Sequence, residues 1–216
     1  LGKMRNQMEK LKNNVMKVAD NRIFCMIWLF IGVGYITWFN SLAVTYLGES
    51  FGRFVKTASV ISMVHPKLYI LWVVFIIVSL WLNVSYMYRH NDYNGKAGRA
   101  FLYLSFISII VTKVIPHEDD FNWRMVVHWG AALTFAFFCT GTVIIFLASK
   151  AKKSKRHLIT LISYVAVIVL MLIWLVVFEE NGAIETLPIW ATYLILYLVN
   201  FTNVYKQKPK DKKALT

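Results

Sequence analysis

Two polar segments that interrupt long apolar runs carry the residue types that could do chemistry. The first is His117-Glu118-Asp119-Asp120, followed by Arg124 and His128. If the apolar helix after it begins near Asp120, then Asp120, Arg124 and His128 lie four residues apart on one helical face. An ionisable residue within a membrane span is a functional candidate. The other interpretation of His128 is a structural hydrogen bond to a neighbouring helix.

The second polar segment, residues 179–182, ends in an Asn-Gly turn and is followed by Glu185. Two interpretations of Glu185 stay open. As an acid in the first turn of the last apolar helix, it suits the positive end of the helix dipole. Alternatively, it pairs across the bundle with His128 or Arg124, which would compensate two groups that are costly to bury.

A histidine beside a carboxylate is the arrangement that general acid–base catalysis uses. The base would be His128 or His117 and the orienting acid Glu185 or Asp120, so the candidate catalytic residues are His128, Glu185 and Asp120. His117, His128 and Glu185 together also offer enough ligands for zinc. However, the HExxH spacing, the GxSxG elbow, the P-loop and the dinucleotide motif are all absent. The sequence therefore requires no cofactor.

The elements that must position these residues are long apolar runs. Hydrophobic residues make up 58% and charged residues 16% of the chain, whereas soluble domains have about 25% charged residues. A soluble globular fold and a disordered chain are therefore both excluded. The runs cover roughly 23–47, 67–88, 99–116, 123–149, 157–178 and 184–204, close to the ~20 residues that a helix needs to cross a bilayer. We expect an all-α, polytopic bundle of six transmembrane helices.

Basic residues are divided unequally between the two sides of this bundle. Of the 24 Lys and Arg residues, 19 fall in the amino-terminal segment, the second and fourth connections and the tail, whereas seven of the 11 acids fall on the opposite side. Basic connections stay in the cytoplasm, so we expect both termini to be cytoplasmic. This orientation accounts for the net charge of +13, and no nucleic-acid binding is expected.

The same orientation gathers the polar residues of both segments at the outer end of the bundle. We expect an outward-facing polar mouth there, formed by His65, His117, Glu118, Asp119, Asp120, Arg124, His128, Glu179, Glu180 and Glu185. His157 falls in a basic connection and is expected to be solvated. In the fourth run, Ala132, Ala136 and Thr140 continue the face of His128, and their small side chains would let another helix approach closely.

Three parts are expected along the chain. Residues 1–22 have apolar positions at helical spacing among lysines, which predicts a basic amphipathic cytoplasmic segment. Residues 23–205 form the six-helix membrane domain, and the Lys-rich residues 206–216 form a disordered tail. A shorter amphipathic stretch, residues 51–61, predicts an interfacial helix before the second span, which Pro66 would open.

The fourth and last spans carry motifs of a known family. The fourth reads His128-Trp129-Gly130-Ala131-Ala132-Leu133-Thr134-Phe135, and the last opens with Gly182-Ala183-Ile184-Glu185. With six spans and both ends inside, the chain resembles the DRAM-type membrane proteins over roughly residues 115–205. That group includes the damage-regulated autophagy modulators and relatives linked to lipid handling at the plasma membrane, to remodelling of lipid-anchored proteins and to channel-associated roles. An aromatic residue often follows the family's acid, whereas Thr186 follows Glu185 here.

These patterns predict an integral membrane protein that binds or organises lipid, or assists a membrane protein partner, through the polar mouth. Anionic lipid would also be held by the basic inner face, at about 1 kcal/mol per Lys or Arg. Two alternatives remain. One is a membrane-embedded lipid hydrolase or transferase; the other is a small transporter, channel or channel accessory subunit, with Asn40, Asn83, Thr134 and Asn200 along its route. Because no organelle signal appears, the expected location is the plasma membrane.

Overall fold

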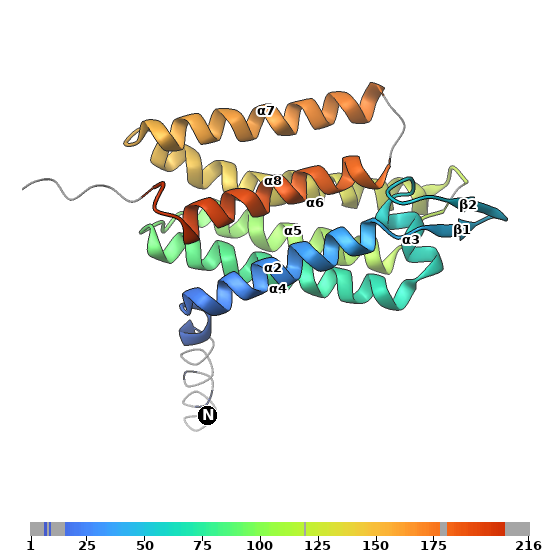
Figure 1. Ribbon diagram of the computed structural model, residues 1–216, viewed down its shortest axis with the longest axis horizontal. Helices are drawn as coiled ribbons and strands as arrows, with labels where there is room; N and C mark the ends of the chain where they lie inside the picture. The colour runs from blue at the N-terminus through green and yellow to red at the C-terminus, as the bar shows by residue number, and fades with distance from the viewer. Residues whose placement is uncertain (1–6, 8, 10–15, 119, 178–180, 206–216) are drawn as a thin grey trace, which may run out of the picture.

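The computed structural model describes residues 7, 9, 16–118, 120–177 and 181–205 of the chain. Its regular elements there are helices and one small hairpin (Figure 1). In chain order they are α2 (Arg22–Asn40), β1 (Val44–Tyr46), β2 (Glu49–Phe51), α3 (Ala58–Val64), α4 (Pro66–His90), α5 (Lys96–Val114), α6 (Trp123–Ala151), α7 (Lys155–Val177) and α8 (Gly182–Phe201). Most of the expected amphipathic segment 1–22, and all of the tail 206–216, lie outside the described residues.

Within these residues, six helices are long and apolar enough to cross a membrane, namely α2 and α4 to α8. The all-α, six-span architecture expected from the sequence is confirmed, and the chain is a membrane protein of this class. The first span is shorter than expected, because α2 ends at Asn40 rather than near residue 47. Ser41 closes the helix by donating its backbone N–H to the carbonyl of Thr37, and the chain then turns into the hairpin.

The hairpin of β1 and β2 was missed because the apolar run continues through Val44 and hides the turn. Leu47 and Gly48 both have positive φ, 51° and 82°, as in the type I′ turn that joins two strands by two residues. Tyr46 and Glu49 form the strand pair beside this turn. Leu47 is exposed, and the hairpin projects beyond the long helices (Figure 1).

The short helix α3 replaces the longer interfacial helix predicted over residues 51–61. It begins only at Ala58, where the hydroxyl of Thr57 accepts the backbone N–H of Val60 at 3.4 Å and so caps the helix. Four of its seven residues are buried, so α3 packs into the bundle rather than lying on its surface. Pro66 opens α4 in its first turn, as expected.

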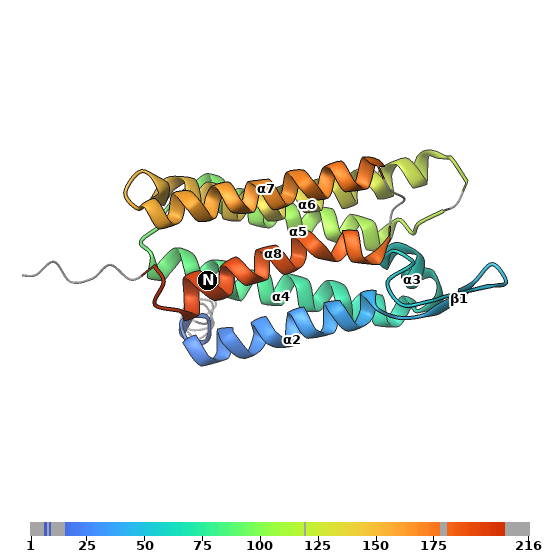
Figure 2. The same ribbon diagram turned by 45° about the horizontal axis from the view of Figure 1, so that its top comes forward.

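The long helices lie along one common axis, with successive spans running in opposite directions, and pack side by side (Figures 1 and 2). α5 lies along α6, α2 lies along α4, and α8 contacts α2, α4, α6 and α7. Asparagine side chains join some of these helices. Asn40 Nδ2 donates to Thr186 Oγ1 at 2.7 Å, and Asn200 Nδ2 donates to the carbonyl of Asn83 at 2.9 Å. Such bonds satisfy polar groups in apolar surroundings, so these asparagines hold helices together.

α7 is packed against the bundle along one narrow stripe. Its buried residues are His157, Tyr164 and Met171, which recur every seven residues. Tyr164 shares a hydrogen bond of 2.6 Å with Thr192 of α8. The expectation that His157 is solvated was wrong, because its ring is buried and lies with its centroid 4.6 Å from that of Tyr205. Most of the other apolar residues of α7 are exposed, as suits a helix that faces lipid.

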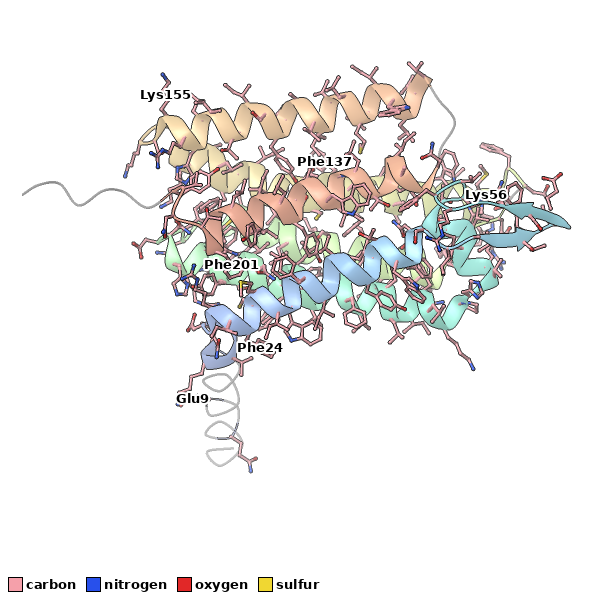
Figure 3. All side chains as sticks on the ribbon, viewed as in Figure 1. Glu9, Phe24, Lys56, Phe137, Lys155 and Phe201 are labelled. Atoms are coloured by element: carbon pink, nitrogen blue, oxygen red, sulfur yellow. The ribbon has the colours of Figure 1, made fainter. Side chains whose placement is uncertain are left out.

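The two ends of the bundle differ in their elements. The hairpin end contains β1, β2, α3, the α5–α6 connection and the start of α8 (right in Figure 1). The terminal end contains the start of α2, the α4–α5 and α6–α7 connections and the end of α8. Side chains fill much of the space between the helices, and Lys56 and Lys155 mark the hairpin end and the terminal end (Figure 3).

Candidate functional site

A cavity of about 360 Å³ lies among the helices in the hairpin half of the bundle. Every helix from α3 to α8 contributes to its wall, which is mainly apolar. The volume falls within the range of about 300–1,000 Å³ that is typical of small-molecule sites. The lining residues with a hydroxyl, imidazole or carboxylate group are Ser59, Tyr69, Thr112, His128, Thr140, Glu185 and Thr192.

His128 is deeply buried, with 1% of its surface exposed. Its Nδ1 lies 2.7 Å from the carbonyl oxygen of Ile115, and its Nε2 lies 2.8 Å from Oγ of Ser59. A carbonyl oxygen only accepts, so Nδ1 carries a proton, and in the tautomer protonated only there Nε2 accepts the hydroxyl of Ser59. These two contacts fix the orientation of the ring between α3 and the α5–α6 connection.

Capping residues set the two helices that carry this pair. The Oδ1 atom of Asn122 accepts the backbone N–H groups of Arg124 and Met125 at 2.8 and 3.1 Å, which starts α6 at Trp123. His128 then falls on the inward face of the second turn. On the other side, the cap that Thr57 gives α3 places Ser59 in the first turn of that helix.

Glu185 reaches the same turn of α3 from α8. One of its carboxylate oxygens accepts the backbone N–H of Ala58 at 2.6 Å. Glu185 and His128 therefore meet on neighbouring residues of α3, and both line the cavity. The direct pair predicted between these two residues is not what the ring nitrogens of His128 form, because they contact Ser59 and Ile115.

Tight backbone packing fixes the start of α8 beside α3. Asn181 caps the helix, and the N–H of Gly182 donates to the carbonyl of Phe54 at 3.0 Å. A Cβ atom on Gly182 would lie 2.7 Å from the carbonyl oxygen of Lys56 and 3.0 Å from that of Asn40. Only glycine fits this contact. The contact keeps the start of α8 close to α3, so that Glu185, one turn further along α8, reaches the backbone of α3.

The predicted row of Asp120, Arg124 and His128 on one helical face was wrong. α6 begins at Trp123 rather than near Asp120, which is exposed in the connection before it. Arg124 instead forms an ion pair with Glu118, with Nη1 and Oε1 3.0 Å apart. Hydrogen bonds from Asn122 and Arg124 stabilise the charged form of Glu118 and lower the pKa of this carboxyl group. Neither Asp120 nor Arg124 lines the cavity.

The remaining residues of the expected polar mouth are only partly gathered. The ring of His117 is half-buried and T-shaped to that of His128, with centroids 5.7 Å apart. His65 lies between α3 and α4 and does not line the cavity. Asp119, Glu179 and Glu180 lie outside the described residues. The site is thus a mainly apolar cavity with a few polar groups in its wall, and the ion pair of Arg124 and Glu118 lies apart from it.

The residues that the structure describes contain no cluster of three or more His, Cys, Asp or Glu side chains that could hold a metal ion. This finding includes the set of His117, His128 and Glu185 considered for zinc. His128 also has both ring nitrogens in hydrogen bonds to protein groups, and a metal would have to displace one of them.

Ser59 is the residue of this site that sequence reasoning missed. It is 69 positions away from His128, and its neighbours match no nucleophile motif. The Thr57 cap is the one local signal, because it predicts where α3 starts and hence that Ser59 lies in its first turn. Nothing in the sequence, however, shows that this turn meets α6.

The small residues of α6 take a different role from the expected one. Ala132, Ala136 and Thr140 share the face of His128 and line the cavity, where their size leaves space instead of drawing another helix close. Close approach occurs at Gly141, where a Cβ atom would lie 2.6 Å from the ring of Phe101. The four residues predicted along a transport route, Asn40, Asn83, Thr134 and Asn200, are not among the cavity's lining residues.

Comparison of the chain with known protein families, with curated proteins and with solved structures finds no match.

Proposed function

We propose that this membrane protein binds a lipid, with an acyl chain inside the cavity and an uncharged polar group at α3. The observation that carries the proposal is the uneven distribution of polar groups around the cavity. Ser59, His128 and Glu185 meet at the first turn of α3. Deeper along the helices, the hydroxyls of Thr140 and Thr192 are bonded to carbonyls of their own helices, which leaves an apolar wall.

The apolar wall alone would give little affinity for a lipid. The interior of a bilayer is as apolar as the cavity, so an acyl chain that moves from one to the other gains little. The polar groups at α3 must therefore determine which lipid binds. The carboxylate of Glu185 disfavours a phosphate beside it, whereas the hydroxyl of Ser59 and its partner His128 suit an ester or hydroxyl group.

The proposed orientation places both chain termini in the cytoplasm and the hairpin end outside, with the plasma membrane as the location. It is supported by the unequal division of Lys and Arg described above. Tags at both termini should be protected from external protease in intact cells, whereas a tag inserted near Asn181 should be cleaved. The opposite accessibility would overturn this orientation and leave the cavity unchanged.

Membership of the DRAM-type group is part of the proposal, because lipid handling is one of the roles to which members of that group are linked. It is supported by the residues from His128 to Phe135 and from Gly182 to Glu185. Both segments contribute to the cavity wall, through His128 and Glu185 among others.

Native mass spectrometry of the full chain released from detergent tests lipid binding. The wild-type protein should retain lipid. Ala136→Trp, which fills the cavity, should lose it, whereas Ala148→Trp, on an exposed position of the same helix, should keep it. Equal lipid retention by both variants would overturn the proposal. Thermal unfolding of both variants checks that each is folded.

A further inference from the structure

Ser59 and His128 have the geometry of a nucleophile and its general base. Oγ of Ser59 lies 2.8 Å from Nε2 of His128, within the ~2.6–3.2 Å that such a pair requires. The carbonyl of Ile115, 2.7 Å from Nδ1, fixes the proton on that nitrogen. Nε2 thus keeps a free electron pair directed at the serine hydroxyl, which is the tautomer that a general base needs.

The pair also lies where a substrate could reach it. Both residues line the cavity, and Ser59 retains partial exposure. Ser62, the neighbouring serine, differs from Ser59. Its hydroxyl donates to the carbonyl of Ser59, within the same helix, at 2.6 Å. Of these two serines on α3, Ser59 is the one that combines a base with access to the apolar cavity.

We propose that Ser59 attacks the ester bond of an acyl lipid in this cavity, with His128 as base, so that the protein is an acyl-ester hydrolase. The proposal rests on the lipid binding proposed above. It names the substrate class, an uncharged carboxylic ester of a long-chain fatty acid, whose chain would occupy the apolar part of the cavity.

The reaction balances with water as the second reactant. Oγ of Ser59 bonds to the ester carbonyl carbon while its proton passes to Nε2 of His128. The bond from that carbon to the alcohol oxygen then breaks, and the alcohol leaves with the electron pair and takes the proton from Nε2. Water next gives a proton to Nε2 and bonds to the acyl carbon. Ser59 leaves with its electron pair, regains the proton and releases the fatty acid.

Two further residues have places in this scheme. Trp72 lines the cavity, and its buried indole N–H has no hydrogen-bond partner in the part of the chain that the structure describes. A polar group of a bound lipid would supply that partner. Glu185 is a positioning residue, because it holds the N–H of Ala58 next to Ser59.

The group that orients His128 is the uncharged carbonyl of Ile115. A carbonyl stabilises an imidazolium less than a carboxylate does.

A serine-directed probe tests the nucleophile. A long-chain alkyl fluorophosphonate incubated with the full-length protein should modify Ser59, as mapped by peptide mass spectrometry. Labelling should disappear in Ser59→Ala and persist in Ser62→Ala, the matched control on the same helix. In His128→Gln, which retains hydrogen-bonding groups but no base, the labelling rate should fall by about 10²–10⁴-fold.

Hydrolysis of p-nitrophenyl palmitate by the same variants should follow the same order. Absence of labelling at Ser59 in a wild-type protein that retains lipid would overturn the hydrolase and leave lipid binding intact. An unchanged labelling rate in His128→Gln would also overturn it. A failure of the lipid-binding proposal can be distinguished from a failure of the hydrolase proposal, because it would appear as equal lipid retention in Ala136→Trp and Ala148→Trp.

Discussion

Two buried histidines, one in each half of the bundle, show how differently its ends use similar side chains. At the hairpin end, both ring nitrogens of His128 are hydrogen-bonded and the ring lines a cavity. At the terminal end, neither ring nitrogen of His157 has a hydrogen-bond partner among the described residues, and the ring packs between Phe146 and Tyr205. The two histidines are therefore alike in burial, and they differ because only His128 combines hydrogen-bond partners with a place in the cavity wall.

Charged residues follow the same division. At the terminal end, Arg22 donates to the carbonyl of Phe201 at 2.7 Å, and the side chain of Lys150 donates to the carbonyl of Asn91. Cations that bind the free carbonyls near helix ends stabilise those ends. At the hairpin end, Glu185 binds a backbone N–H within the cavity wall. The charged groups of the first end anchor helix ends, whereas Glu185 at the second lies in the wall of the cavity for which we propose a lipid.

The largest expected effect on stability comes from the close backbone contact of Gly182 at the hairpin end. Gly182→Ala should lower the free energy of unfolding by about 1–3 kcal/mol, because its Cβ would overpack against backbone carbonyls that cannot move easily. Gly130→Ala is the matched control, since nothing lies within 4 Å of that Cβ position, and it should be neutral or slightly stabilising. Thermal unfolding in detergent measures both, and equal melting temperatures would contradict the account of Gly182.

Replacing each histidine by leucine tests the comparison directly. His128→Leu should cost about 1–3 kcal/mol, because the hydroxyl of Ser59 and the carbonyl of Ile115 lose their partner in a partly buried site. His157→Leu removes two buried nitrogens without described partners and should leave stability unchanged or raise it. Chemical unfolding of both variants under one condition provides the measurement. A larger loss for His157→Leu would reverse the roles assigned to the two residues.

Glu185 should show a smaller and local effect. Glu185→Ala removes the acceptor of the Ala58 N–H and should cost about 1 kcal/mol, in the range found for lost helix caps. Glu185→Gln keeps an acceptor oxygen and should restore most of the loss. Hydrogen exchange at the Ala58 amide should be faster in the alanine variant and close to wild type in the glutamine variant. Identical exchange in all three proteins would show that Glu185 does not hold α3.

The smallest effect concerns the ion pair on the surface of the hairpin end. Since folding lowers the pKa of Glu118 from its usual value of 4.5, the pair stabilises the protein above that value and loses this contribution as the pH falls through the folded pKa. Glu118→Gln should therefore melt slightly below the wild type at pH 7. The two melting curves should converge in acid, and a constant difference would contradict the assignment.

The parts of this molecule that the sequence predicts are those that depend on local patterns. Long apolar runs predicted the spans, and Pro66 predicted the start of α4. The type I′ turn was hidden because Leu47 continues an apolar run, and the row through Asp120 failed because Asn122 caps α6. The contact of Ser59 with His128 joins distant segments through packing, which a single sequence does not encode in any local pattern.

Cross-linking of a lipid to the protein tests the central claim most directly. A photoactivatable diacylglycerol with a diazirine on one acyl chain, incorporated with the full-length chain into lipid nanodiscs, should react with residues of the cavity wall in α6 and α8. These cross-links should disappear in Ala136→Trp and remain in Ala148→Trp. Cross-links confined to the exposed face of α7, equal in all three proteins, would contradict the claim that the cavity at the hairpin end holds a lipid.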